Sequence, residues 1–462
     1  MGRTGCDARA APALAAPQIK LAEGPTLIAD YDSMEIPLDG RHRRALLLTS
    51  FVVAALLIWQ ASILWLARHW LESGNLALMT RGIALTPGDG AGWDRIGQLR
   101  QSDFANLSVP EAIAAYRKAV TVDPRSPHYW LDLATAYDVA GDSARAQDAY
   151  AHAKAAAPLS AEVAFSYGNF LTRNGNYPEA YAELRQAVRS NPKLLPLAIS
   201  RTWRALENVD QLNQILPVTS DAYLQAVDFF ASNHQLDPAL MEWRHLMALR
   251  QSVSLPSTFP FLDELIHEDR ADDARRVWVE ARAAAGMPDE AASHSLIWNG
   301  DFKQDFANGG LGWRWSPVQG ATIDFDSQPG PEGLRALRLD FTGGSNVNLG
   351  APLQFVPVQP QTTYHFHAYM RTQDITTESG LRFSIIDPNH PSAVSVLTEN
   401  LTGTHPWNAQ DANVTTGPET HFLLVRLFRS QSRLFDNRLS GTVWIAGVSL
   451  VQAGAQAEQS PR

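Results

Sequence analysis

One residue pattern repeats in two consecutive stretches, PRSPHYWLDLATAYDVAGDSARAQDAYAHAKAAA at 124–157 and PLSAEVAFSYGNFLTRNGNYPEAYAELRQAVRSN at 158–191. Pro124, Pro158 and Pro192 stand 34 residues apart. The recurring positions hold Trp130, Leu133, Ala134, Tyr137, Gly141, Ala146, Tyr150 and Ala153, and then Ala164, Tyr167, Gly168, Leu171, Gly175, Ala180, Leu184 and Ala187. This period predicts a helical hairpin per unit, in which small residues allow close helix contacts and proline ends the second helix.

The pattern resembles that of the tetratricopeptide (TPR) repeat. The stretch WDRIG at 93–97 matches the opening of the first TPR helix, and 110–119 supplies a second helix. Pro87 precedes Pro124 by 37 residues, and a longer loop at 102–109 accommodates the surplus. We therefore expect a helical solenoid over 71–290, with clear repeats at 93–192 and degenerate hairpins at its ends.

In the TPR family, the inner face of each first helix commonly contacts peptide ligands. The family positions map onto His128, Leu131, Thr135 and Asp138, and then onto Glu162, Phe165, Asn169 and Thr172. These residues include no Lys or Arg, so the face lacks the basic clamp that binds acidic carboxyl termini. The resemblance implies a protein partner of another kind, or a face that packs on the C-terminal part of the chain.

The segment ALLLTSFVVAALLIWQASILWLA at 45–67 contains no charged residue. As a helix it would extend about 34 Å, enough to cross a bilayer core. The stretch RHRR at 41–44 precedes it, and Trp59, Trp65 and Trp70 lie towards its far end. We expect a single membrane span within 41–70, a disordered cytoplasmic tail at 1–40 and a periplasmic remainder, in a bacterial inner membrane. A cleaved signal peptide and a buried soluble helix are the alternatives.

Composition excludes some classes of protein. The chain has 462 residues and a net charge of −10, which disfavours a nucleic-acid binder. The single cysteine, Cys6, excludes an internal disulfide framework and a cysteine-based zinc site.

After residue 293 the pattern changes to period-2 segments separated by Gly, Asn, Pro and Thr turns. The predicted strands lie at 334–341, 345–349, 353–358, 363–371, 380–386, 413–415, 421–429 and 441–452. Their number and spacing predict a C-terminal antiparallel β-sandwich of jelly-roll type over 293–453, followed by a disordered tail at 454–462. The expected fold class is multidomain α + β: a transmembrane helix, a TPR-type solenoid and a jelly roll.

The order of motifs in 297–451 resembles the carbohydrate-binding jelly rolls related to galactose-binding-like domains. NGDF at 299–302, GW at 312–313, the strand around Tyr364–Arg371 and VWIAGVSL at 443–450 carry this resemblance. It implies sugar binding, for which we select Trp315, Tyr369, Arg371, Trp407 and Asn408 because sugars stack on aromatic faces and bond planar polar groups. The acidic pair near the family's end is Ala446-Gly447 here, so a structural calcium ion would rest on Asp301 without those partners.

No catalytic motif stands out. His365 and His367 form half of a metal site without a third ligand, and Glu264, His267 and Glu268 share one helical face. We expect no cofactor and a non-enzymatic membrane scaffold that presents a TPR surface and a glycan-binding-like module, acting in polysaccharide export, polymerisation or envelope assembly. The alternatives are a pure protein-interaction scaffold, whose C-terminal module docks a protein, and an unrecognised glycan-active enzyme.

Overall fold

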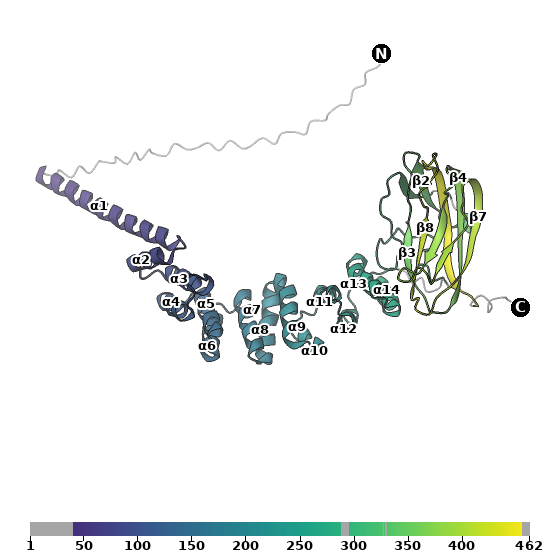
Figure 1. Cartoon of the computed structure of the whole chain (residues 1–462). Helices are drawn as coiled ribbons and strands as arrows, with labels where there is room; N and C mark the ends of the chain where they lie inside the picture. The colour runs from purple at the N-terminus through teal and green to yellow at the C-terminus, as the bar shows by residue number, and fades with distance from the viewer. Residues whose placement is uncertain (1–39, 288–294, 327, 329, 455–462) are drawn as a thin grey trace, which may run out of the picture. The chain divides into compact units, whose positions relative to one another are not determined.

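The structure is a computed structural model, and it describes residues 40–287, 295–326, 328 and 330–454. The predicted tail at 1–40 and nearly all of that at 454–462 lie outside these residues. The chain divides into two compact units, Met1–Pro87 and Gly88–Arg462. Figure 1 labels the elements of both units.

The first unit contains two helices, α1 (Gly40–Leu71) and α2 (Leu76–Leu85). Among the described helices, α1 alone is long and apolar enough to cross a membrane. Its last turns pack on α2, where Ala67 and Leu71 are buried. A Cβ on Gly82 would lie 2.8 Å from the carbonyl oxygen of Ala67, so glycine permits this close approach. The end of the apolar helix therefore supplies the packing partner of α2.

The second unit begins with three helical hairpins. Their helices are α3 (Gly90–Ser102), α4 (Val109–Val122), α5 (Pro127–Val139), α6 (Ser143–Ala156), α7 (Ala161–Arg173) and α8 (Tyr177–Ser190). Helices α5 and α7 begin 34 residues apart, as do α6 and α8. Gly97 and Gly168 lie at close helix contacts, since a Cβ there would come within 2.5 Å of Tyr116 and 2.7 Å of Leu184, respectively. The TPR-type repeat predicted for this region is thus confirmed.

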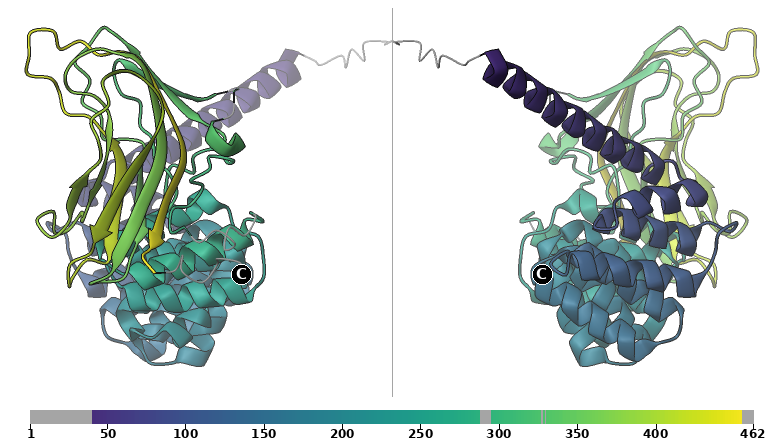
Figure 2. Two further views of the ribbon diagram at one scale, coloured as in Figure 1. Left: turned by 90° about the vertical axis from the view of Figure 1, so that its right-hand side faces the viewer. Right: turned by 90° about the vertical axis from the view of Figure 1, so that its left-hand side faces the viewer.

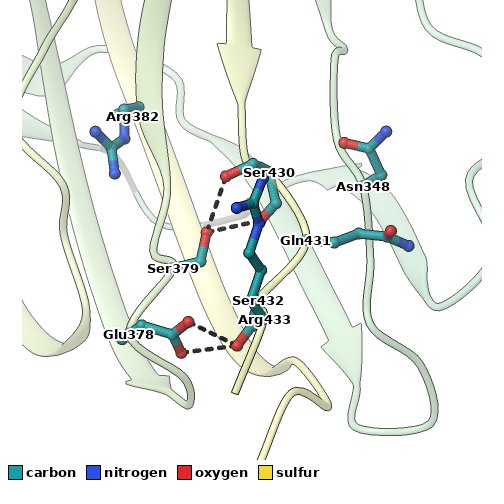
Figure 3. A pocket seen from close by; sticks show the side chains of 8 residues that line it. All are labelled: Asn348, Glu378, Ser379, Arg382, Ser430, Gln431, Ser432 and Arg433. Atoms are coloured by element: carbon teal, nitrogen blue, oxygen red, sulfur yellow. Dashed lines mark hydrogen bonds between the residues drawn. The ribbon is translucent and has the colours of Figure 1, made fainter.

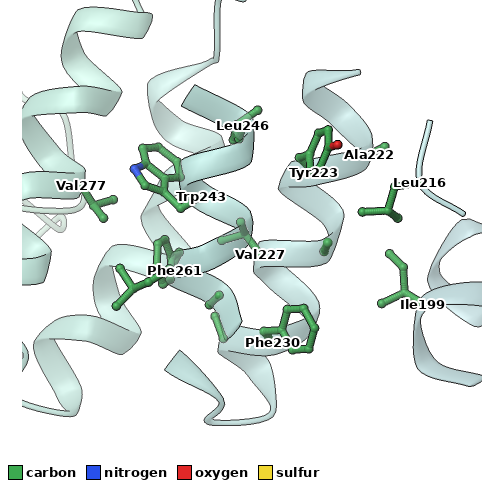
Figure 4. Close-up of a cluster of buried hydrophobic side chains, with 14 of the residues drawn as sticks. Ile199, Leu216, Ala222, Tyr223, Val227, Phe230, Trp243, Leu246, Phe261 and Val277 are labelled. Carbon is green, nitrogen blue, oxygen red and sulfur yellow. The ribbon is translucent and has the colours of Figure 1, made fainter. Parts of the chain in front are cut away.

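The helices continue without the strict period. They are η1 (Pro192–Leu194), α9 (Leu195–Leu206), α10 (Val209–Asn213), α11 (Ser220–Ser232), α12 (Leu236–Ala248), η2 (Leu255–Thr258), α13 (Phe259–His267) and α14 (Ala271–Ala284). One continuous hydrophobic cluster runs from α7 to α14. Figure 4 shows its middle part, where Trp243, Phe230 and Phe261 fill the space between helices. Packing of large side chains has replaced the regular small–large alternation of the repeats.

The C-terminal region contains two antiparallel sheets. The strands are β1 (Ala321–Phe325), β2 (Leu337–Thr342), β3 (Leu353–Pro357), β4 (Thr363–Ile375), β5 (Arg382–Ile386), β6 (Ser395–Leu397), β7 (Gly403–Thr415), β8 (Phe422–Phe428) and β9 (Ser440–Gln452), with one short helix, η3 (Pro331–Gly333). One sheet has the order β1-β2-β9-β4-β7, and the other β3-β8-β5-β6. Inward side chains of both sheets share one hydrophobic core, to which Phe366 and Phe383 contribute.

Some predicted strands differ from those in the structure. The segment 345–349 forms only an isolated bridge between Leu349 and Arg429, because its polar groups bond to residues 429–432 instead of to a strand. β1 and β6 were not predicted. β7 is longer than the predicted 413–415, because Gln410 and Asn408 stand at positions of the inward face and hide the alternation.

Helices α13 and α14 pack directly on the C-terminal region (Figure 2). Trp278 of α14 meets Trp298 edge-on, with ring centroids 6.2 Å apart. Gly309 lies so near Phe259 that a Cβ would come within 2.1 Å of its ring. Leu311 and Phe422 belong to the same buried cluster as the helices. The end of the helical array and the sheets therefore share a hydrophobic core.

Candidate functional site

A cluster of four polar side chains joins the first helices of two successive hairpins. Asp94 and Gln98 come from α3, and His128 and Asp132 from α5; we call them the α3–α5 cluster. Nε2 of His128 lies 3.6 Å from Oδ2 of each aspartate. The side-chain amide of Gln98 donates to the same two oxygens over 3.0 Å. Four side chains that are distant in sequence thus converge on one point.

The environment of Asp94 is unusual for a carboxylate. The residue is only 4% exposed, and its Oδ1 is buried without a hydrogen-bond partner. Burial, and after it the nearby charge of Asp132, raise the pKa of Asp94 to about 7, whereas the charges of His128 and Arg95 oppose this shift. Burial, together with these carboxylates, also raises the pKa of Tyr116 on α4. The cluster therefore holds two carboxylates whose charge His128 and Arg95 only partly offset.

The eight predicted TPR-face residues divide by burial. Four are buried among the helices: Leu131, Phe165, Asn169 and Thr172. The Asn169 side chain donates to the carbonyl of Phe165, and that of Thr172 donates to the carbonyl of Gly168. Their polar groups are thus satisfied within α7, and these residues serve packing in this structure.

The other four predicted face residues remain accessible to different degrees. His128 and Glu162 are exposed, whereas Thr135 and Asp138 are half-buried. Asp138 forms an ion pair with Arg173 of α7, and the Thr135 hydroxyl donates to the carbonyl of Leu131. Of these four residues, only His128 belongs to the α3–α5 cluster.

The sequence analysis missed Asp94 and Gln98, although a signal for them was present. The family mapping was applied only to the two regular repeats. Helices α3 and α5 begin 37 residues apart. With this offset, Asp94 occupies the repeat position of Leu131, and Gln98 occupies that of Thr135. Extending the mapping to the irregular α3–α4 hairpin would therefore have found both residues.

Three of the five predicted sugar-contacting residues lie together on the outer face of the five-stranded sheet. Tyr369 and Trp407 pack against a small buried cluster built around Trp444, and the guanidinium of Arg371 lies 4.4 Å from the ring centroid of Trp444. The segment before β2 covers these rings, since Leu334 and Ala336 pack in the same cluster. The chain itself thus partly covers this outer aromatic cluster, in which Tyr369 and Trp407 are half-buried.

Acidic side chains satisfy the polar atoms of the outer aromatic cluster. The Tyr369 hydroxyl donates to Glu332 over 2.9 Å, and the indole N–H of Trp444 donates to Asp326. The bond to Glu332 raises the pKa of Tyr369. The backbone N–H of Gln328, followed by the bond from Trp444, lowers the pKa of Asp326. The hydroxyl of Tyr369 and the indole N–H of Trp444 therefore both donate to partners within the chain.

Asn408 and Trp315 are placed elsewhere. Asn408 is paired with Met370 in the β4–β7 register, so it lies on the opposite face from Tyr369, and its amide approaches Glu399. Trp315 precedes β1, and its half-buried ring packs against the core between the sheets. The five predicted residues therefore do not form one site.

A polar cavity of about 620 Å³ lies at one end of the four-stranded sheet (Figure 3). It is lined by Asn348, Glu378, Ser379, Arg382, Ser430, Gln431, Ser432 and Arg433. The Ser432 hydroxyl donates to Glu378 over 2.7 Å, and the Ser379 hydroxyl donates to the carbonyl of Ser430. The side chains of Asn348, Arg382, Gln431 and Arg433 offer additional planar polar groups around it.

A buried arginine supports the cavity. Arg429 is fully buried, and its guanidinium donates to Ser379 O over 2.7 Å, to Thr377 Oγ1 over 3.1 Å and to the carbonyl of Val347. Burial lowers its pKa, and the charge of Glu378 opposes this shift. The guanidinium thus joins two loops, 377–379 and 346–347, to the end of β8. An arginine in the inward register of an apolar strand, as in VRLFR at 425–429, is the sequence signal for it.

The predicted metal candidates are placed as follows. Asp301 forms an ion pair with Lys303 over 2.6 Å and is absent from both potential metal-binding groups of the described residues. His365 and His367 both approach Oδ1 of Asp411, at 3.3 and 2.8 Å. Glu264 and Glu268 contact the exposed His234 instead of His267, with Nδ1 of His234 2.5 Å from Glu264.

Comparison with known proteins gives no family. No family model matches the chain, and no curated protein matches it. Among the solved structures that match are YrrB, described as a TPR protein with an unusual peptide-binding site (16% identity, TM-score 0.24, covering 45% of this chain and 92% of that one), PilF of Pseudomonas aeruginosa (18%, 0.23, 42% and 90%) and MamA (16%, 0.23, 43% and 92%). The assignment of TPR-type repeats accordingly rests on the helix boundaries and spacing of this chain.

Proposed function

We propose that this protein is a non-enzymatic scaffold, anchored in a membrane by α1, that binds a protein partner through its TPR-type repeats. The observation that carries the proposal is the α3–α5–α7 face, the surface formed by the first helices of the three hairpins. It bears the exposed His128 and Glu162 and the half-buried Asp138. Its surplus of carboxylates suits a partner segment that is rich in Lys and Arg.

Photo-crosslinking in cells tests the partner. A crosslinking amino acid at Glu162, on the first helix of its hairpin, should give a discrete adduct. Glu179 is a matched control because it is also an exposed glutamate, on the second helix of the same hairpin. Equal adducts from both positions, or none from either, would refute binding at this face. Glu162→Lys should also reduce the adduct formed from Asp138.

The proposed orientation puts the N-terminus in the cytoplasm and the repeats in the periplasm of a bacterial inner membrane. It is supported by RHRR at 41–44 before the apolar helix and by the single Arg68 close after it. A reporter that is active only in the periplasm, fused after Arg462, should be active. Activity of a cytoplasmic reporter at the same position would reverse the orientation.

The polar cavity favours a second candidate function, glycan binding by the C-terminal module. We propose that the two sheets form a β-sandwich of jelly-roll type that binds a polysaccharide during its export or polymerisation, or during envelope assembly. Amide, carboxylate and guanidinium groups line the cavity, and these recognise sugar hydroxyls in directed hydrogen bonds. Because the outer aromatic cluster is covered, the cavity is the better location for such a site.

Variants of the full chain distinguish the two locations. Polysaccharide binding should fall about tenfold or more in Arg382→Ala and Gln431→Ala, since each removes hydrogen bonds to the sugar. Gln373→Ala is the matched control, because Gln373 is an exposed polar residue at the end of β4 outside the cavity. If polysaccharide binding fell only in Trp407→Ala or Trp315→Ala, the sugar would bind at the residues that the sequence predicted and not in the cavity.

A further inference from the structure

We propose that the α3–α5 cluster is a binding site for a transition-metal dication, with Asp94, His128 and Asp132 as ligands and Zn²⁺ as the representative ion. The site would join the first two hairpins of the second unit, α3–α4 and α5–α6. Metal binding needs only side chains of this chain, although His128 also lies on the face proposed to bind the partner.

The distances suit an ion of this size. Zn²⁺ binds nitrogen and oxygen ligands at about 2.0–2.2 Å, and tetrahedral geometry then places neighbouring ligand atoms roughly 3.4 Å apart. Nε2 of His128 already lies 3.6 Å from Oδ2 of Asp94 and from Oδ2 of Asp132. These two distances are thus within tenths of an ångström of the expected spacing, and all three ligand atoms lie within 4.8 Å of one another.

The donor set also fits. One imidazole and two carboxylates suit zinc and its neighbours in the first transition row. His128 and Asp132 are four residues apart on α5, so they lie on one face of the helix, and Asp94 on α3 supplies the third ligand. Gln98, which donates to both coordinating oxygens, would orient the carboxylates as outer hydrogen-bond donors do in metal sites.

The charges of His128 and, more weakly, Arg95 only partly offset those of the two carboxylates. In the described residues, the ion pairs of Asp94 and Asp132 are with His128 and not with Lys or Arg. Oδ1 of Asp94 is buried without a partner, which is costly for a carboxylate. A bound cation would supply the missing charge. It would also leave a coordination position open on the side of the exposed His128, whose side chain is 52% accessible.

Titration of the full chain in detergent with Co²⁺ alone tests the proposal, because bound Co²⁺ reports its ligands through visible absorption. We expect saturable binding at a site that is lost, or at least about tenfold weaker, in His128→Ala and in Asp132→Asn. Zn²⁺ should displace the cobalt signal, and it should raise the thermal midpoint of the wild type more than that of either variant.

A matched control is available on α6. His152 has a side chain that is 50% exposed and lies 3.7 Å from Asp148 at a spacing of four residues, but no third ligand joins them among the described residues. His152→Ala should leave the cobalt spectrum unchanged. His234→Ala controls for the separate exposed group formed with Glu264 and Glu268. Equal cobalt binding by wild type, His128→Ala and Asp132→Asn would overturn the proposal, as would loss of the signal only in His234→Ala.

Discussion

The α3–α5 cluster and the outer aromatic cluster both contain residues at family positions associated with ligands, yet their local environments are opposite. In the outer aromatic cluster, Trp444 and Tyr369 donate to Asp326 and Glu332, and the chain covers the rings. In the α3–α5 cluster, a buried oxygen of Asp94 has no partner. A family position thus indicates where a residue stands, whereas unsatisfied bonding capacity indicates where a ligand is needed.

The largest expected loss of stability follows from a substitution in the outer aromatic cluster. Trp444→Ala should lower the free energy of unfolding by about 3–5 kcal/mol, because Trp444 is only 7% exposed and holds both Asp326 and Arg371. Chemical denaturation, followed by the fluorescence of the remaining tryptophans, measures this change. A loss below about 1 kcal/mol would show that the rings are not held as a core and would reopen them as a ligand surface.

In the α3–α5 cluster we expect a substitution to stabilise the protein, by an amount smaller than the loss in Trp444→Ala. The pKa of Asp94 is raised to about 7, so its stabilising contribution is complete below its ordinary value of 3.8 and is lost as the pH rises through 7. Asp94→Asn in metal-free protein should therefore raise the free energy of unfolding by about 1–3 kcal/mol at pH 8. It should add little at pH 4.

Thermal unfolding of wild type and Asp94→Asn between pH 4 and pH 8, with a chelator present, gives the comparison. Added Zn²⁺ should then reverse the order at pH 8, since only the wild type keeps all three ligands. A wild-type stability that does not fall between pH 5 and pH 8 would contradict the raised pKa of Asp94.

The smallest expected effect concerns a single hydrogen bond. Tyr369→Phe should cost about 1 kcal/mol or less, because it removes the bond to Glu332 while leaving the ring packing in place. The variant should also leave polysaccharide binding unchanged. A marked loss of glycan binding with intact stability would place the sugar on this face after all.

The regular parts of the fold could be predicted from the sequence, and the singular contacts could not. The 34-residue period gave α5–α8 closely, because each unit carries the same small, large and proline positions. Asp94 was missed because its unit has a 37-residue offset. Most of β7 was missed because the polar Gln410 occupies an inward position opposite Ala368. The polar cavity depends on Arg429 bonding to loops distant in sequence, which no local pattern encodes.

Trp278 and Phe259 pack against residues 298–312. This contact limits where the chain can be truncated and how its C-terminal region could be transferred to another protein. A fragment that began at Ser295 would carry Leu311 and Phe422 without the helices that bury them. The two sheets are therefore not expected to fold as an isolated domain. The smallest piece that could move between proteins with its polar cavity intact would have to bring α13 and α14 along.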